Sequence, residues 1–165
     1  MQKRSLAGKA QRVRLLLLDV DGVMTDGGIY YSARGVAMKR FCAQDGYGVV
    51  RAREHGLDLA LISGRSSPIV TARARDLRID NVFQGVDDKL AAARDVAGEK
   101  GLAFEELAFI GDDLFDLELL LEVGLSAAPS DARVELRRTV DYVTRAAGGE
   151  GAVREFIDLI LRHQR

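Results

Sequence analysis

Short apolar runs alternate with longer segments of mixed character along most of the chain. The runs at residues 15–18, 59–62 and 107–110 contain no polar residue, which is typical of strands buried on both faces of a parallel sheet. Weaker strand patterns cover residues 81–84, 124–127 and 141–143. Apolar residues recur at helical spacing over residues 44–55, 67–77, 87–100, 114–122, from 130 onward, and 152–162. This order predicts an α/β fold, a doubly wound parallel sheet with helices on both faces.

Residues 28–41 interrupt this alternation. They contain two β-rich runs separated by residues 32–35, which is the pattern of a β-hairpin, and Gly35 can adopt the positive φ that such a turn needs. A hairpin is too small to form a domain, and no linker or shift in composition marks a second one. We therefore expect one domain over residues 1–165, with a flexible arm at 1–13, the hairpin at 28–41, and a C-terminal loop and helix at 148–165 that begins with a flexible, glycine-rich stretch.

Charge and composition limit the possible partners. The formal net charge is −1, so the sequence gives no electrostatic argument for binding nucleic acid or a membrane surface. Residues 1–14 are basic and polar and lack the apolar core of a secretory signal, and the leucines at 15–18 are too few to span a bilayer. Cys42 is the single cysteine and excludes an intrachain disulfide. We expect a soluble, cytoplasmic protein with no nucleic-acid or membrane partner.

The first apolar strand leads directly into two carboxylates. Asp19 and Asp21 follow it at the carboxyl end of a predicted parallel strand, where open α/β sheets bind their ligands. A spacing of two places both side chains on one face of an extended chain, and Gly22 permits a turn immediately afterwards. Neighbouring carboxylates repel each other unless a cation or a proton separates them, and hard oxygen ligands suit Mg²⁺. An ordinary acidic turn is the alternative interpretation of an isolated Asp-x-Asp pair.

Polar residues also follow the later strands. Ser63 ends the strand that includes 59–62, Lys89 begins the helix after 81–84, and Asp112 follows 107–110. The carboxyl ends of parallel strands meet at one edge of a sheet, so these side chains are expected to converge with Asp19 and Asp21. Each residue alone has a simpler interpretation: a serine there usually caps the next helix, and a lone lysine is usually solvated.

Together these residues suit the hydrolysis of a phosphate monoester. Asp19 can attack phosphorus and hold it as an acyl phosphate. Asp21 can protonate the leaving oxygen and then activate water. The Ser63 hydroxyl and the Gly64 amide can bind phosphate oxygens, and Lys89 supplies positive charge. Magnesium can be held by Asp19, the backbone carbonyl of Asp21, and Asp112.

In this order the motifs resemble those of the haloacid dehalogenase superfamily of phosphotransferases. That superfamily carries Asp-x-Asp, a strand-end Ser or Thr, a Lys, and Gly-Asp-Asp-x-x-Asp, and the match covers residues 15–128. Longer segments are similar to the 3-deoxy-D-manno-octulosonate 8-phosphate phosphatase family, and these are residues 19–27, 45–48, 62–65, 84–85, 88–89 and 148–155. This is the short-capped branch of the superfamily, in which a hairpin replaces the cap domain.

The resemblance implies a Mg²⁺-dependent phosphatase of lipopolysaccharide precursor synthesis, and a homotetramer with the hairpin 28–41 at the subunit interface. It implies catalytic roles for Asp19, Asp21, Ser63 and Lys89, and metal ligation by Asp19, Asp21 and Asp112. It also implies that the phosphorylated sugar acid is bound by Asp21, Cys42, Ala43, Gln44, Asp45, Gly46, Gly64, Arg65, Arg73 and Lys89. Independently of the resemblance, guanidinium groups at Arg65 and Arg73 suit a substrate carboxylate, although Arg73 also fits a solvated basic helix face.

Some features leave other functions open. Glu150 stands where the octulosonate family usually carries Arg and where the related nononate 9-phosphate phosphatases tend to carry Glu, whereas Arg65 and the Asp45-Gly46 pair favour the octulosonate family. A long C-terminal tail that orders over a neighbour's site is expected to be missing. A non-catalytic, phosphatase-like partner domain would have lost a catalytic carboxylate. A phospho-Asp receiver domain would carry its phosphorylated Asp on a later strand.

Overall fold

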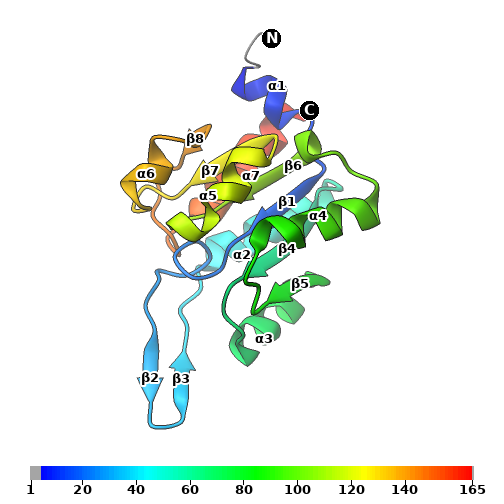
Figure 1. Ribbon diagram of the computed structural model, residues 1–165. Helices are drawn as coiled ribbons and strands as arrows, with labels where there is room; N and C mark the ends of the chain where they lie inside the picture. Colours follow the sequence, from blue (N-terminus) through cyan, green and yellow to red (C-terminus); the bar gives the residue numbers. More distant parts are fainter. Residues whose placement is uncertain (1–4, 165) are drawn as a thin grey trace.

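A six-stranded parallel sheet forms the centre of the structure, in the order β5-β4-β1-β6-β7-β8 (Figure 1). The computed structural model describes residues 5–164. The strands are β1 (Leu15–Leu18), β2 (Tyr30–Ser32), β3 (Gly35–Met38), β4 (Asp58–Ser63), β5 (Asn81–Gln84), β6 (Leu107–Ile110), β7 (Leu125–Ala128) and β8 (Tyr142–Val143). The α-helices are α1 (Leu6–Ala10), α2 (Ala43–Glu54), α3 (Pro68–Leu77), α4 (Lys89–Lys100), α5 (Leu117–Glu122), α6 (Val134–Arg137) and α7 (Ala152–His163), and the 3₁₀ helices are η1 (Phe104–Glu106) and η2 (Leu114–Asp116). None of these helices is long and apolar enough to cross a membrane.

The four leucines of β1 occupy the middle of the sheet, and their side chains alternate between its two faces. Leu16 and Leu18 pack into a core with α1, α2, α3 and α7, whereas Leu15 and Leu17 pack into a second core with α4, α5 and α6. Strand β1 pairs with β4 on one side and β6 on the other, so all four side chains are buried. The doubly covered parallel sheet confirms the predicted fold class.

The predicted hairpin is also present, and it stands apart from the sheet (Figure 1). Strands β2 and β3 pair only with each other, and Gly35 follows the turn with a φ of +104°. Its base is closed by a bridge between Thr25 and Phe41. Large apolar side chains on it are exposed, including Tyr31 at 69% and Met38 at 59%. A two-stranded hairpin of this kind is marginally stable in water on its own.

The flexible arm predicted for residues 1–13 is wrong for residues 5–13, and the first four residues lie outside the described part of the chain. Ser5 caps α1 by accepting a hydrogen bond from the Gly8 amide at 3.2 Å. Ala10 and Val13 are buried in the same core as α7, and Leu6 packs against that core. Leu6 and Ala10 are four residues apart, which places them on one face of α1, and Val13 follows after the turn that ends the helix. The basic composition of the segment concealed this apolar face.

The predicted loop and helix at the C-terminus are present, but the glycine-rich part is packed and not flexible. Gly148, Gly149 and Gly151 are buried, and the Gly149 amide donates to the Val23 carbonyl at 3.0 Å. A Cβ atom on Gly148 would lie 1.9 Å from the Gly22 carbonyl oxygen, so only glycine fits at this contact. The C-terminal segment therefore packs against the loop that follows β1 and stabilises it.

Candidate active site

A cavity of about 420 Å³ opens where the central strands end. Seven of the predicted site residues line it, namely Asp19, Asp21, Ser63, Gly64, Arg65, Lys89 and Asp112. They come from four segments: the loop after β1, the end of β4, the start of α4 after β5, and the loop after β6. Because these strands are parallel, their carboxyl ends lie at one edge of the sheet, and residues far apart in the sequence converge there.

Lys89 lines the cavity, and its side chain is only 4% exposed. Its ammonium nitrogen is 2.5 Å from Oδ1 of Asp19 and 2.5 Å from Oδ1 of Asp116. The rings of Phe109 and Phe115 lie 5.8 and 5.3 Å from the same nitrogen, measured to the ring centroids. Burial lowers the pKa of Lys89, but the charges of Asp19 and Asp116 outweigh it and raise the pKa above its ordinary value. The lysine therefore stays charged.

Three carboxylates surround this single ammonium group. Asp19, Asp112 and Asp116 each place one oxygen within 4.8 Å of the others. Burial raises the pKa of Asp19 to about 7, against the opposing effect of Lys89, and the charge of Asp116 adds to the rise. Burial and the charges of Asp19, Asp116 and Asp113 raise the pKa of Asp112 to about 8. The raised pKa values show that the positive charge of Lys89 does not neutralise all three carboxylates. A divalent cation that prefers hard oxygen ligands would supply the missing positive charge.

Asp116 contacts both Lys89 and the backbone of the loop after β6. Its Oδ2 accepts hydrogen bonds from the amides of Asp112 and Asp113 at 2.9 and 3.3 Å, while Oδ1 binds Lys89. It thus holds both the loop after β6 and the Lys89 side chain in place. A Cβ atom on Gly111 would approach the Asp116 carboxylate to 2.6 Å, so the glycine at this position permits the close packing.

Ser63 and Gly64 form the part of the cavity wall that suits phosphate. The Ser63 side chain is buried, and its Oγ accepts a hydrogen bond from the Arg65 amide at 3.2 Å. A serine hydroxyl also carries one donor hydrogen, which can serve a phosphate oxygen in the cavity. Ser67, and not Ser63, occupies the N-cap position of α3, so the helix-cap interpretation of Ser63 does not hold.

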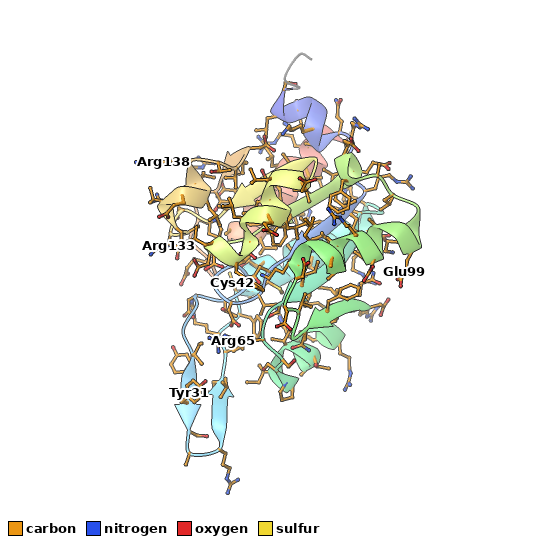
Figure 2. The ribbon with its side chains drawn as sticks, in the orientation of Figure 1. Tyr31, Cys42, Arg65, Glu99, Arg133 and Arg138 are labelled. Carbon is orange, nitrogen blue, oxygen red and sulfur yellow. The ribbon has the colours of Figure 1, made fainter. Side chains whose placement is uncertain are left out.

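Both a charged side chain and apolar side chains contribute to the lining of the cavity. Arg65, which is labelled in Figure 2, is exposed and lines the cavity. Ile29, from the segment that leads into the hairpin, and Phe115, which is 53% exposed, line it as well. Neither residue could be assigned to the site from the sequence, because Ile29 lies in a loop without periodicity and Phe115, in η2, is one of several apolar residues in that region.

Lys39 contacts a residue of the cavity, although its position in the sequence does not indicate this. Its side chain is 2% exposed and forms an ion pair with Asp21 at the cavity. Lys39 directly follows β3, so it stands at the base of the hairpin. In the sequence it is one of several basic residues beside an exposed hairpin, and its partner is set by tertiary structure.

The structure does not bring residues 42–46 or Arg73 into the lining of this cavity. The Asp45 carboxylate is buried and accepts hydrogen bonds from the amides of Gly151 and Arg154, at 3.3 and 2.8 Å, so it caps the start of α7. Arg73 lies over the Phe41 ring at 5.5 Å and binds Asp76 at 2.6 Å. Their predicted contacts with substrate stay predictions, and both side chains have structural partners within the chain.

Comparison with known proteins places this geometry in a family. A model described as haloacid dehalogenase-like hydrolase matches residues 78–157. The chain is 45% identical over 156 residues to 3-deoxy-D-manno-octulosonate 8-phosphate phosphatase KdsC from Escherichia coli strain K12, which covers 94% of this chain and 83% of that protein. It is similar to the 3-deoxy-D-manno-octulosonate 8-phosphate phosphatase structure from Yersinia pestis, with a TM-score of 0.94, 43% identity, and coverage of 96% of this chain and 86% of that one.

A second solved structure carries ligands. The enzyme of the same name from Moraxella catarrhalis, in complex with magnesium, phosphate and a KDO molecule, matches with a TM-score of 0.94 and 40% identity, over 96% of this chain and 91% of that one. Identity at this level over nearly the whole length of both chains extends well beyond the shared fold. The chain belongs to the 3-deoxy-D-manno-octulosonate 8-phosphate phosphatase family of haloacid dehalogenase-like hydrolases.

Proposed function

We propose that this protein is a magnesium-dependent phosphomonoesterase that hydrolyses 3-deoxy-D-manno-octulosonate 8-phosphate to the free sugar acid and phosphate. The observation that carries the proposal is the buried Lys89, which holds Asp19 beside Asp112 and Asp116 in a cavity large enough for a small ester. The relatives named above support the substrate and the metal. All the carboxylates that the reaction needs are present, which argues against a non-catalytic partner domain.

Asp19 acts as the nucleophile in this mechanism. One carboxylate oxygen attacks phosphorus and forms an acyl phosphate, while the bond from phosphorus to the sugar oxygen breaks. Lys89 holds Oδ1 of Asp19 at 2.5 Å, so the carboxylate is already oriented before substrate enters. Asp19, Asp112 and the backbone carbonyl of Asp21 would hold Mg²⁺, with Asp116 beside them. When bound, the metal supplies positive charge that neutralises the phosphate dianion.

Asp21 completes both halves of the reaction. It donates a proton to the leaving sugar oxygen as that bond breaks, and it then takes a proton from the water that attacks the acyl phosphate. The second step releases phosphate and restores the Asp19 carboxylate. Ser63 and the Gly64 amide bind the phosphoryl oxygens, and Lys89 offsets their charge.

Arg65 is the residue that we assign to the sugar acid. It is exposed at the mouth of the cavity, within reach of the part of a substrate that projects from the phosphate site. A guanidinium group binds a carboxylate in a bidentate manner. A nononate 9-phosphate is the alternative substrate, because Glu150 is typical of that family. Glu150 is engaged by Arg40 at 2.6 Å and by this contact helps to anchor the base of the hairpin.

The exposed hairpin supports a homotetramer as the working assembly. Four large apolar side chains of the hairpin are 37–69% exposed, namely Tyr30, Tyr31, Val36 and Met38. Strands β2 and β3 pair only with each other, so they are not part of the central sheet. Tyr31 projects from the side of the hairpin in Figure 2. A neighbouring copy can bury these side chains, and closed symmetric assemblies are the usual form of soluble homo-oligomers. We place the hairpin against the active site of the next subunit.

The function is tested by measuring phosphate release from octulosonate 8-phosphate, a nononate 9-phosphate and p-nitrophenyl phosphate, with Mg²⁺ and with EDTA. We expect the octulosonate ester to have the highest kcat/KM, and EDTA to stop turnover of all three. Asp19→Asn should reduce kcat by about 10⁴-fold or more while its circular dichroism is unchanged, since a nucleophile is removed. Near-normal activity of this variant, or a higher kcat/KM for the nononate ester, would contradict the proposal.

Metal binding predicts a particular pH dependence of stability. In the metal-free protein the pKa values of Asp19 and Asp112, about 7 and about 8, lie above the ordinary value of 3.8, so the folded state holds protons more tightly than the unfolded one. The resulting stabilisation is complete below that ordinary value and is lost as the pH rises through about 7 to 8. Mg²⁺ binds the ionised groups, so it should raise the melting temperature more at pH 8 than at pH 5.

Differential scanning fluorimetry with Mg²⁺ or EDTA at the two pH values measures this difference. Asp112→Asn should remove most of the magnesium-dependent rise at pH 8. Glu99→Gln is the matched control, because Glu99 is an exposed acid on α4 outside the site. An equal effect of Mg²⁺ at both pH values would show that the cluster does not hold the metal.

Arg65→Ala tests the contact with the sugar acid. Hydrogen bonds to charged groups contribute about 1.5–3 kcal/mol, so KM for the octulosonate ester should rise by about tenfold or more. KM for p-nitrophenyl phosphate should change little, because that ester has no carboxylate. Arg75→Ala is the control, an exposed arginine on α3 that does not line the cavity. An equal rise for both esters would assign Arg65 to the phosphate instead.

The assembly is tested by sedimentation velocity at micromolar concentration. The double variant Tyr31→Lys/Met38→Lys places charges on the exposed hairpin and should give smaller species with lower activity on the sugar acid ester. Leu121→Lys is the control, because Leu121 is 62% exposed on α5, away from the hairpin. A wild-type protein that is monomeric and fully active would refute the proposed assembly.

A further inference from the structure

The Lys39 side chain is buried although the strand just before it is exposed. The strand that precedes it, β3, carries exposed side chains, yet the Lys39 side chain is 2% exposed and reaches the Asp21 carboxylate. Lysine side chains are almost never fully buried unless they are paired. The base of the hairpin therefore places one ammonium group, that of Lys39, against the Asp21 carboxylate, which we assign as the general acid.

The Asp21 carboxylate depends on this contact more than the Asp116 carboxylate depends on any one of its own. It lies in a loop after β1, next to Gly22 with a φ of +86°, and its side chain is 21% exposed. Within residues 5–164, Lys39 is the only side chain that donates to the Asp21 carboxylate. Asp116, by contrast, is held by Lys89 and two backbone amides. The orientation of Asp21 is thus set from the base of the hairpin.

The base of the hairpin is fixed on its other side as well. Arg40, the next residue, binds Glu150 at 2.6 Å and lies 3.6 Å from Asp26, and a backbone bridge joins Thr25 to Phe41. Two consecutive basic residues thus bind different partners: Lys39 pairs with Asp21 of the active site, and Arg40 pairs with Glu150 of the glycine-rich segment. This arrangement offers a matched pair of variants, one inside and one outside the site.

We infer that Lys39 is a positioning residue, which holds the Asp21 carboxyl group toward the leaving oxygen and links proton donation to the seating of the hairpin. This inference rests on the proposed function, because it assigns Asp21 as the general acid. Lys39 acts through Asp21 and is not itself the proton donor. Its effect should depend on how much help the leaving group needs, since a sugar alkoxide needs a proton and a nitrophenolate does not.

The test measures the rate of enzyme phosphorylation in single turnover, as release of the sugar acid or of nitrophenol. The sugar acid or nitrophenol leaves as the acyl phosphate forms. Its appearance therefore measures the first step alone and not the later hydrolysis of the acyl phosphate, which is common to both esters. General acid catalysis contributes about 10²–10⁴-fold, so Lys39→Met should slow the sugar acid ester by about 100-fold and p-nitrophenyl phosphate by only a few fold. Lys39→Arg, which keeps the charge, should recover most of the loss. In an Asp21→Asn background, Lys39→Met should add no further loss.

Arg40→Met is the matched control, because Arg40 binds Glu150 and does not contact Asp21, and it should leave the ratio of the two rates unchanged. Lys39→Gln is a second neutral variant, and melting curves establish that each variant is folded. Equal losses with both esters, or a further loss in the Asp21→Asn background, would overturn the inference. If the octulosonate ester proves not to be a substrate, the proposed function fails, and the same ratio measured with any alkyl phosphate that the enzyme hydrolyses still decides the role of Lys39.

Discussion

A single buried ammonium group faces three clustered carboxylates, and the rest of the site depends on this imbalance. Lys89 binds Asp19 and Asp116 at 2.5 Å each, with Asp112 close by. Removing charged groups from water is costly unless they are paired, so one lysine cannot satisfy all three acids. The excess negative charge raises the pKa values of Asp19 and Asp112 and creates a need for a second cation. The same cation is what a phosphate dianion requires in order to approach a carboxylate nucleophile.

Close backbone packing holds these charges at short range. A Cβ atom on Gly22 would lie 2.0 Å from Oδ2 of Asp112, and one on Gly148 would meet the Gly22 carbonyl oxygen. Glycines thus allow the loops after β1 and β6 and the segment before α7 to meet where the sheet ends. The hairpin adds Lys39 from a third direction. Proton donation, metal binding and the position of the hairpin are consequently joined through one small region of the backbone.

Most of the fold and the centre of the site could be predicted from the sequence, because the signals were local. Unbroken apolar runs identified the buried strands, and residues at their carboxyl ends converge since parallel strands share an edge. The Lys39–Asp21 pair could not be predicted, because it depends on how the base of the hairpin packs beside the loop after β1. The contact by which Asp45 caps α7 could not be predicted either, because its partner is more than a hundred residues away in the sequence. The packed glycines at 148–151 and the helix at 6–10 were missed because composition suggested mobility where tertiary contacts give order.

The most direct test of this account is to locate the phosphoryl group during turnover. Excess enzyme is mixed with the octulosonate ester and Mg²⁺, quenched rapidly in acid, and digested for peptide mass spectrometry. The account predicts a peptide that contains Asp19 with the mass of one added phosphoryl group, formed while the sugar acid is released and absent from Asp19→Asn. Consumption of the ester with no phosphorylated Asp19 peptide at any quench time, or with the phosphoryl group on another residue, would contradict it.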